Sequence, residues 1–160
     1  MKNNFDFQIN SQLLFGIGKT KEITELLSRN NWSKIALLAD IGVAQKSKYF
    51  QEIEALLKNE YSDVHIILLR GNEEPSYDYL DKIANEIRVI SNLDVIIGIG
   101  GGSTLDMTKA LAGLYTNPGP GIKYRGFDNL LNPALPSICI PTTAGTGSEV
   151  TINAVFTDKN

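Results

Sequence analysis

The sequence has few residues of the kinds that most often bind metals or act as nucleophiles, because it contains one histidine and one cysteine. His65 alone cannot supply a cluster of imidazole ligands, and no G-x-S-x-G turn accompanies it to indicate a nucleophilic serine. We therefore expect His65 to be a structural or surface residue. Cys139 cannot close an internal disulfide, and it stands in the apolar run Ser137 to Pro141, which predicts a buried and unreactive thiol.

An excess of positive charge and long apolar runs are also missing. The net charge is −3 at neutral pH and lysines alternate with acidic residues, which argues against a nucleic-acid surface. No run approaches the ~20 apolar residues of a membrane helix, and Met1 to Asn10 lacks the apolar core of a secretory signal. We expect a cytoplasmic protein without nucleic-acid or membrane partners, and a chain of 160 residues is long enough for one globular domain.

Short aliphatic runs alternate with segments of helical spacing along most of the chain. The runs predict strands at Lys34 to Asp40, Val64 to Leu69, Asp94 to Gly98 and Ser137 to Ile140. The apolar spacing predicts helices at Lys19 to Arg29, Ala44 to Asn59, Tyr77 to Ile90 and Ser103 to Tyr115. This alternation predicts an α/β domain with an open, mostly parallel sheet, helices on both faces and a ligand beyond the carboxyl ends of the strands.

Three further segments have weaker patterns. Phe5 to Gly16 alternates weakly, as an edge strand or hairpin would. Asn117 to Pro136 contains four prolines and three glycines, which predicts a long connection. Ile152 to Thr157 is expected to form a further strand near the end of the chain.

A glycine-rich turn, GIGGGSTLD, follows the third predicted strand. Gly100, Gly101 and Gly102 would let a pyrophosphate approach the backbone, and the next helix would point its free N–H groups and positive dipole end at it. We expect Ser103 to be both the N-cap of this helix and a phosphate donor. Asp106 fits two roles equally well, a capping box with Ser103 or a place in the ligand shell.

Two familiar nucleotide motifs do not fit. The turn departs from the usual dinucleotide fingerprint, because Ser103 stands where a last Gly or Ala is expected and the turn follows a later strand. The sequence Gly18-Lys19-Thr20 ends like a P-loop, but Leu13 stands where the leading glycine is needed.

Two other predicted strand ends carry polar groups. Asp40 could accept hydrogen bonds from an adenosine ribose and repel a 2′-phosphate, which favours NAD over NADP, or it could be a helix N-cap. The run PTTAGTGSEVT, Pro141 to Thr151, places four hydroxyl side chains and two glycines before Glu149. Such a loop can hydrogen-bond ribose, phosphate or amide groups, and it can also be an ordinary polar turn.

Three strings together resemble the signatures of a known family. GGGSTLDMTKA (100–110) and IPTTAGTGSEVTINAVFTD (140–158), with TNPGP (116–120) between them, are similar to those of the iron-containing, group III alcohol dehydrogenases. The resemblance implies a Rossmann-like NAD(P)-binding domain over residues 1–160, like the N-terminal domain of dehydroquinate synthase. It implies an oxidoreductase that transfers hydride between a small alcohol and an aldehyde or ketone.

The resemblance also implies which residues bind the cofactor. They are Asp40, Pro75, Ser76, Gly100, Gly101, Gly102, Ser103, Asp106, Thr142, Thr143 and Thr146. Pro75 and Ser76 are included because Glu-Pro-Ser is similar to a looser Asn-Pro-Thr turn of the family. Lys109 matches the signature too, and its alternative role is an ion pair with Asp106 on the helix surface.

In that family a second, helical domain holds Fe²⁺ or another divalent metal through one Asp and three His, and we expect no counterpart of it in this chain. We therefore expect no catalytic or metal-binding residues here and no activity of the chain alone. A missing domain should leave an apolar face open, which predicts self-association or a homo-oligomer. The alternative interpretation is a stand-alone nucleotide-binding module with a regulatory or assembly role.

Overall fold

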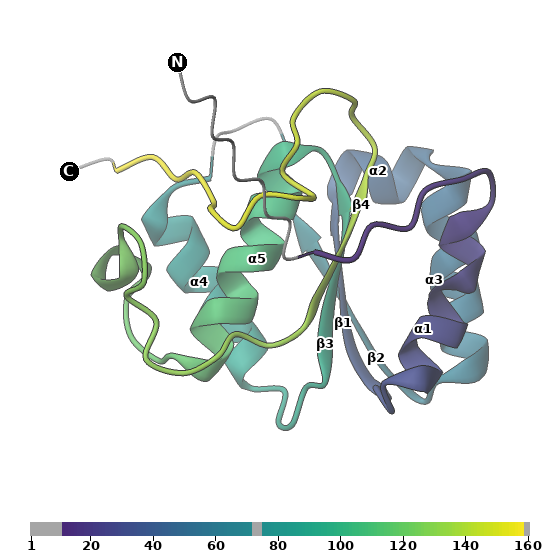
Figure 1. The fold of residues 1–160 in the computed structure, drawn as a ribbon, viewed down its shortest axis with the longest axis horizontal. Helices are drawn as coiled ribbons and strands as arrows, with labels where there is room; N and C mark the ends of the chain where they lie inside the picture. Colours follow the sequence, from purple (N-terminus) through teal and green to yellow (C-terminus); the bar gives the residue numbers. More distant parts are fainter. Residues whose placement is uncertain (1–10, 72–74, 159–160) are drawn as a thin grey trace, which may run out of the picture.

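A computed structural model describes residues 11–71 and 75–158, and it has a four-stranded, fully parallel sheet between two layers of helices (Figure 1). The strands are β1 (Lys34–Asp40), β2 (Asp63–Leu69), β3 (Val95–Gly100) and β4 (Ser137–Pro141). Their order across the sheet is β2-β1-β3-β4. The predicted α/β class with an open parallel sheet is confirmed, and the four strands predicted from aliphatic runs lie within two residues of their observed bounds.

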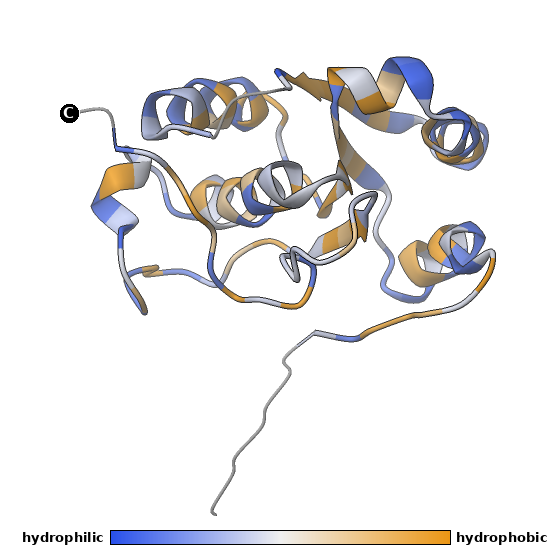
Figure 2. Cartoon of the chain, turned by 90° about the horizontal axis from the view of Figure 1, so that it is seen from above, coloured by the Kyte–Doolittle hydropathy of each residue, from blue (hydrophilic) through white to orange (hydrophobic). Residues whose placement is uncertain are grey.

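The two central strands are aliphatic on both faces because each face packs against helices. Ile35 and Leu37 of β1 point into one core with Val95 and Ile97 of β3, whereas Leu38 points into the other core. Every residue of β3 is buried. Figure 2, seen from above, shows the hydrophobic colouring concentrated on the strands and on the inner sides of the helices.

Helices cover both faces of the sheet. One layer contains η1 (Lys19–Glu22), α1 (Ile23–Arg29) and α3 (Lys48–Glu60), and the other contains α4 (Tyr77–Arg88) and α5 (Gly102–Thr116). Two short helices, α2 (Ile41–Lys46) and η2 (Gly121–Tyr124), complete the set in the described residues. Apolar side chains at helical spacing anchor the longer helices, as Phe50, Ile53 and Leu57 do in α3.

One predicted helix is two helices. The segment Ala44 to Asn59 was expected to be continuous, but the chain forms α2 directly after β1 and then breaks at Ser47. Ser47 has an extended backbone (φ −93°, ψ 112°), and its hydroxyl accepts a hydrogen bond from Phe50 N at 3.4 Å. A serine in this conformation is a favourable N-cap, so it starts a new helix at a new angle.

The predicted strand Ile152 to Thr157 is wrong. Side chains of α5 bind the backbone of residues 151–155, so these peptide groups are not available to a sheet. The segment makes a single parallel bridge, between Thr157 and Ser76. In Phe5 to Gly16, the first six residues lie outside the described ones, and residues 11–16 form no strand.

The long connection after α5 is confirmed, with η2 as its one short helix in the described residues. Asn117, which is 1% exposed, holds it together because its side-chain oxygen accepts hydrogen bonds from Leu131 N and Asn132 N. Within the described part of the chain, no helix is both long and apolar enough to cross a bilayer.

Candidate nucleotide site at the carboxyl ends of the strands

The carboxyl ends of β1, β3 and β4 meet at one edge of the sheet, where α2, α5 and a polar loop begin. The loop, residues 142–150, leaves β4 and arches over the start of α5 (Figure 1). Its first residue is fixed to the neighbouring strand, because Thr142 N donates to Gly100 O at 2.9 Å. The structure therefore brings the two most distinctive sequence motifs together.

Two glycines of β3 allow α5 to pack directly on the strand. A Cβ on Gly98 would overlap the side chain of Thr108, and a Cβ on Gly100 would overlap that of Thr104. Both threonines are buried. The missing Cβ of Gly100 thus makes room for a helix side chain, so this residue can offer only its backbone to a ligand.

The N-terminus of α5 is open to a ligand. The N-cap is Gly101, with an extended backbone (φ −79°, ψ −176°), and no side chain among the described residues accepts a hydrogen bond from the first turn. The prediction that Ser103 is the N-cap is wrong, because the helix begins one residue earlier, at Gly102, and Ser103 lies exposed in its first turn. The positive end of a 15-residue helix and its free N–H groups favour an anion here.

Hydroxyl groups of the 142–150 loop lie against this helix end. A Cβ on Gly101 would lie 3.2 Å from Thr143 Oγ1, and one on Gly102 would lie 3.3 Å from Ser148 Oγ and from Thr146 Cβ. The loop turns tightly at Gly145 and Gly147, which have φ of 96° and 66°. Thr142, Thr143 and Thr146 remain exposed.

Ser148 was absent from the residues predicted for the site. Its hydroxyl lies as close to the glycine turn as the side chain of Thr146 does. The available signal was its place in a run of hydroxyl residues beside glycine. Glu149 follows it and has a buried Oε2 without a hydrogen-bond partner among the described residues.

Asp106 does not cap α5, which corrects the capping-box alternative. Its Oδ1 lies 3.0 Å from Lys109 Nζ, and its Oδ2 accepts a hydrogen bond from Val155 N at 3.0 Å. The predicted pair with Lys109 is therefore present. It is not on the surface, because the two side chains are only 11% and 13% exposed.

Asp40 is the N-cap of α2, as one of its two interpretations predicted. Its Oδ1 accepts hydrogen bonds from Gly42 N at 2.7 Å and Val43 N at 3.3 Å. A Cβ on Gly71, two residues after the end of β2, would overlap Oδ2, so that glycine lets the carboxylate lie against the backbone there. Since Ala39 pairs with Ile99, Asp40 lies beside the end of β3.

Pro75 and Ser76 lie at the start of α4, and both are buried. Ser76 caps this helix by accepting a hydrogen bond from Tyr79 N at 3.4 Å. The backbone of Thr157 bonds to both neighbours of Ser76. Thr157 N donates to Pro75 O at 2.9 Å, and Tyr77 N donates to Thr157 O at 3.3 Å. These contacts tie Pro75 and Ser76 to the C-terminal segment.

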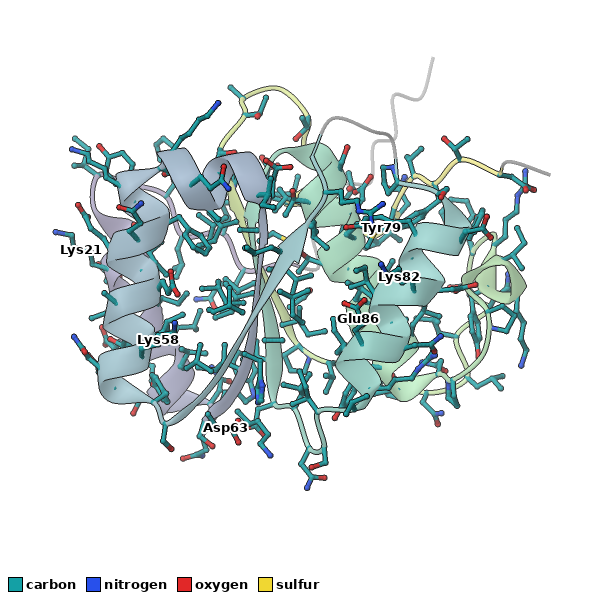
Figure 3. The ribbon with its side chains drawn as sticks, turned by 180° about the vertical axis from the view of Figure 1, so that it is seen from behind. Lys21, Lys58, Asp63, Tyr79, Lys82 and Glu86 are labelled. Carbon is teal, nitrogen blue, oxygen red and sulfur yellow. The ribbon has the colours of Figure 1, made fainter. Side chains whose placement is uncertain are left out.

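The single histidine lies near the surface, as one of its predicted interpretations has it, whereas the single cysteine is half-buried and not fully buried as predicted. Burial raises the pKa of the Cys139 thiol to about 11, a rise that nearby Lys109 opposes and Asp106 and Glu149 reinforce, so the thiol is unreactive near neutral pH. His65 Nε2 lies 2.6 Å from Asp63 Oδ1, at the surface. Asp63 starts β2, at the end of the sheet opposite the polar loop (Figure 3).

Residues 11–71 and 75–158 contain no group of three or more His, Cys, Asp or Glu side chains that could hold a metal ion. The described part of the chain therefore does not fit the iron of the family that the sequence resembles. The uncapped helix end and its glycine turn, in contrast, fit a dinucleotide pyrophosphate.

Comparisons with known proteins agree with this geometry. The family model of iron-containing alcohol dehydrogenases matches residues 10–160. The sulfoacetaldehyde reductase of Bilophila wadsworthia is 38% identical over 149 residues, which cover 92% of this chain and 37% of that protein.

Solved structures show the same fold. An alcohol dehydrogenase from Oenococcus oeni superposes with a TM-score of 0.84 and 30% identity, covering 98% of this chain and 41% of that one. The sulfoacetaldehyde reductase of Bifidobacterium kashiwanohense, solved in complex with NAD⁺, gives a TM-score of 0.77 and 25% identity, covering 92% and 38%. The chain thus spans well under half the length of these relatives. It belongs to the iron-containing alcohol dehydrogenase family.

Proposed function

We propose that this chain binds NAD(P) at the start of α5, as the cofactor-binding part of a metal-dependent alcohol dehydrogenase. The observation that carries the proposal is the uncapped N-terminus of α5, which begins in a glycine turn and faces the hydroxyls of the 142–150 loop. An anionic pyrophosphate satisfies both the free N–H groups and the helix dipole. The NAD⁺ complex of a relative with the same fold supports the choice of ligand.

Each part of the site has a separate task in this proposal. The backbone of Gly101, Gly102 and Ser103 binds the pyrophosphate, while Thr142, Thr143 and Thr146 bind ribose or amide groups further along the dinucleotide. Asp40, at the end of β1 and beside the end of β3, accepts hydrogen bonds from the adenosine ribose. Its cap bonds use Oδ1 and leave Oδ2, so its negative charge favours NAD over NADP, whose 2′-phosphate it repels. The bound nicotinamide supplies the hydride acceptor or donor.

The dehydrogenase reaction needs groups beyond those described here. The matched segment covers only 37% of the sulfoacetaldehyde reductase of Bilophila wadsworthia, and the described residues offer no metal site. We propose that a metal-binding domain like that of the family would supply the metal ion that polarises the oxygen of a small alcohol or aldehyde. We propose the cytoplasm as the place of this reaction. The 160-residue chain alone is then expected to bind cofactor without oxidising alcohols.

Calorimetric titration of the chain with NAD, NADP and ADP-ribose tests the proposal. We expect saturable binding of NAD and ADP-ribose and weaker binding of NADP. Gly101→Asp places a carboxylate where the pyrophosphate lies and should weaken binding at least ~10-fold, about 1.4 kcal/mol. Asn92→Asp adds the same charge in an exposed turn before β3, at the other end of the sheet, and should leave binding unchanged. Equal loss in both variants, or no binding by the parent chain, would refute the proposal.

A further inference from the structure

Lys109 and Asp106 are two charged residues of α5 that face away from solvent. They are separated by one helical turn, and their side chains are 13% and 11% exposed. Lys109 Nζ lies 3.0 Å from Asp106 Oδ1. Charged groups this far from water are stable only when they are paired and hydrogen-bonded, so their remaining contacts are informative.

Among the described residues, the remaining contacts all go to one segment, residues 151–155. Lys109 Nζ donates to Thr151 O at 3.3 Å, to Thr151 Oγ1 at 3.0 Å and to Asn153 O. Asp106 Oδ2 accepts from Val155 N at 3.0 Å. The pair thus binds every second residue of an extended segment that forms no strand of its own.

These bonds use the polar atoms of the pair. An ammonium group has three protons, and Lys109 already has four oxygen acceptors within reach, counting Asp106. Both oxygens of Asp106 are engaged as well. A dinucleotide would have to displace one of these contacts before Lys109 could donate to it, at the cost of an acceptor left unpaired.

The segment 151–155 directly follows the 142–150 loop, so the pair fixes the far end of that loop. The near end is fixed by Thr142 N on Gly100 O. Between them, Val150 N donates to Gly147 O and Thr151 Oγ1 donates to Ser148 O at 3.4 Å. The loop that faces the glycine turn is therefore held at one end by β3 and at the other by Asp106 and Lys109.

We infer that Asp106 and Lys109 are positioning residues, which hold the 142–150 loop over the start of α5 without contacting the dinucleotide. The expected effect on NAD binding rests on the proposed function. The anchoring of the loop does not, because it is a property of the free chain. It gives Asp106 a role different from the direct cofactor contact that the family signature implies.

Amide hydrogen exchange of the free 160-residue chain tests the anchoring. Lys109→Met keeps the aliphatic stem and removes the donors, and Asp106→Asn removes the charge. Both should speed exchange at the bonded amides of Thr142, Val150 and Val155 by ~10-fold or more, while β1 and β3 keep their protection. Lys109→Arg, which keeps a charged donor, should lose less protection than Lys109→Met. The matched control is Lys82→Met on the exposed face of α4 (Figure 3), which should change nothing.

NAD titration of the same variants separates positioning from direct contact. We expect Lys109→Met and Asp106→Asn to bind NAD ~10-fold more weakly, and Lys109→Arg to bind NAD more tightly than Lys109→Met does. Weaker NAD binding with unchanged exchange in the free chain would overturn the inference, because it would indicate direct ligands. Unchanged exchange and unchanged affinity would overturn it as well. If the parent chain binds no NAD, the proposed function fails, and the exchange measurement still decides whether the pair anchors the loop.

Discussion

At the scale of single residues, Asp94 shows how one carboxylate stabilises the sheet far from the proposed site. Its Oδ2 accepts hydrogen bonds from Ser33 N at 2.8 Å and Lys34 N at 2.9 Å, at the start of β1. Backbone hydrogen bonds, from Lys34 first and Ser33 second, lower the pKa of Asp94 below its ordinary 3.8, although burial opposes them. A lowered pKa means that the folded chain favours the charged carboxylate.

The stability that Asp94 provides is therefore present above pH 3.8 and lost as the pH falls through its lower folded pKa. We expect Asp94→Asn to lower the free energy of unfolding at pH 7 by ~1–2 kcal/mol and to flatten its decline in acid. Urea denaturation between pH 2.5 and 7 measures both. Because Asp94 lies at the amino ends of the strands, NAD affinity should stay unchanged, and a variant as acid-sensitive as the parent would contradict this account.

Residue chemistry also explains which local features of the site region could be predicted from the sequence. Asp40 and the hydroxyl residues after β4 could be singled out in the sequence, because acidic and hydroxyl side chains are uncommon inside buried strands. The sequence could not distinguish Ser103 from Gly101 as the N-cap, because serine has the better capping side chain and only the backbone dihedrals of Gly101 decide. The pair of Asp106 with Lys109 follows a local helical spacing, but its other partner, Val155, lies 49 residues away in the chain, beyond any local pattern.

At the scale of elements, the buried parallel strands were predictable because helices on both faces require aliphatic residues at every position. The strand order and the split between α2 and α3 were not. The break at Ser47 depends on where Asp40 starts α2, and the local sequence pattern does not specify that position. The residues from Ile152 to Thr157 are suitable for a strand, but side chains of α5 form hydrogen bonds with the backbone of this segment.

The packing of α5 on β3 predicts a coupling between two residues. We expect Gly98→Ala to destabilise the fold by ~1–3 kcal/mol, because its Cβ would overlap Thr108. Thr108→Ala relieves part of the overlap, so the double variant should be more stable than the sum of the two single changes implies. Urea denaturation of the parent chain, the two single variants and the double variant measures this coupling. Strictly additive changes in the free energy of unfolding would contradict the close contact between Gly98 and Thr108.

At the scale of the whole molecule, apolar side chains remain exposed along the N-terminal segment. Phe15 and Ile17 are almost fully exposed, and Figure 2 shows this hydrophobic stretch beside α1. We expect the chain to self-associate through such surface, as sedimentation velocity over a range of concentrations can measure. Phe15→Ser with Ile17→Ser should reduce association, whereas Val89→Ser, at an exposed site after α4, should not. A parent chain that stays monomeric at ~1 mM would contradict the expectation.

The most direct test of the account locates the ligand on the molecule. Amide NMR of the 160-residue chain, titrated with ADP-ribose, reports which N–H groups meet the dinucleotide. The account predicts the largest shifts at Gly101, Gly102 and Ser103 and in the 142–150 loop, with α1 and the amino ends of the strands unchanged. Saturable binding that leaves the amides at the start of α5 unmoved would contradict the central claim.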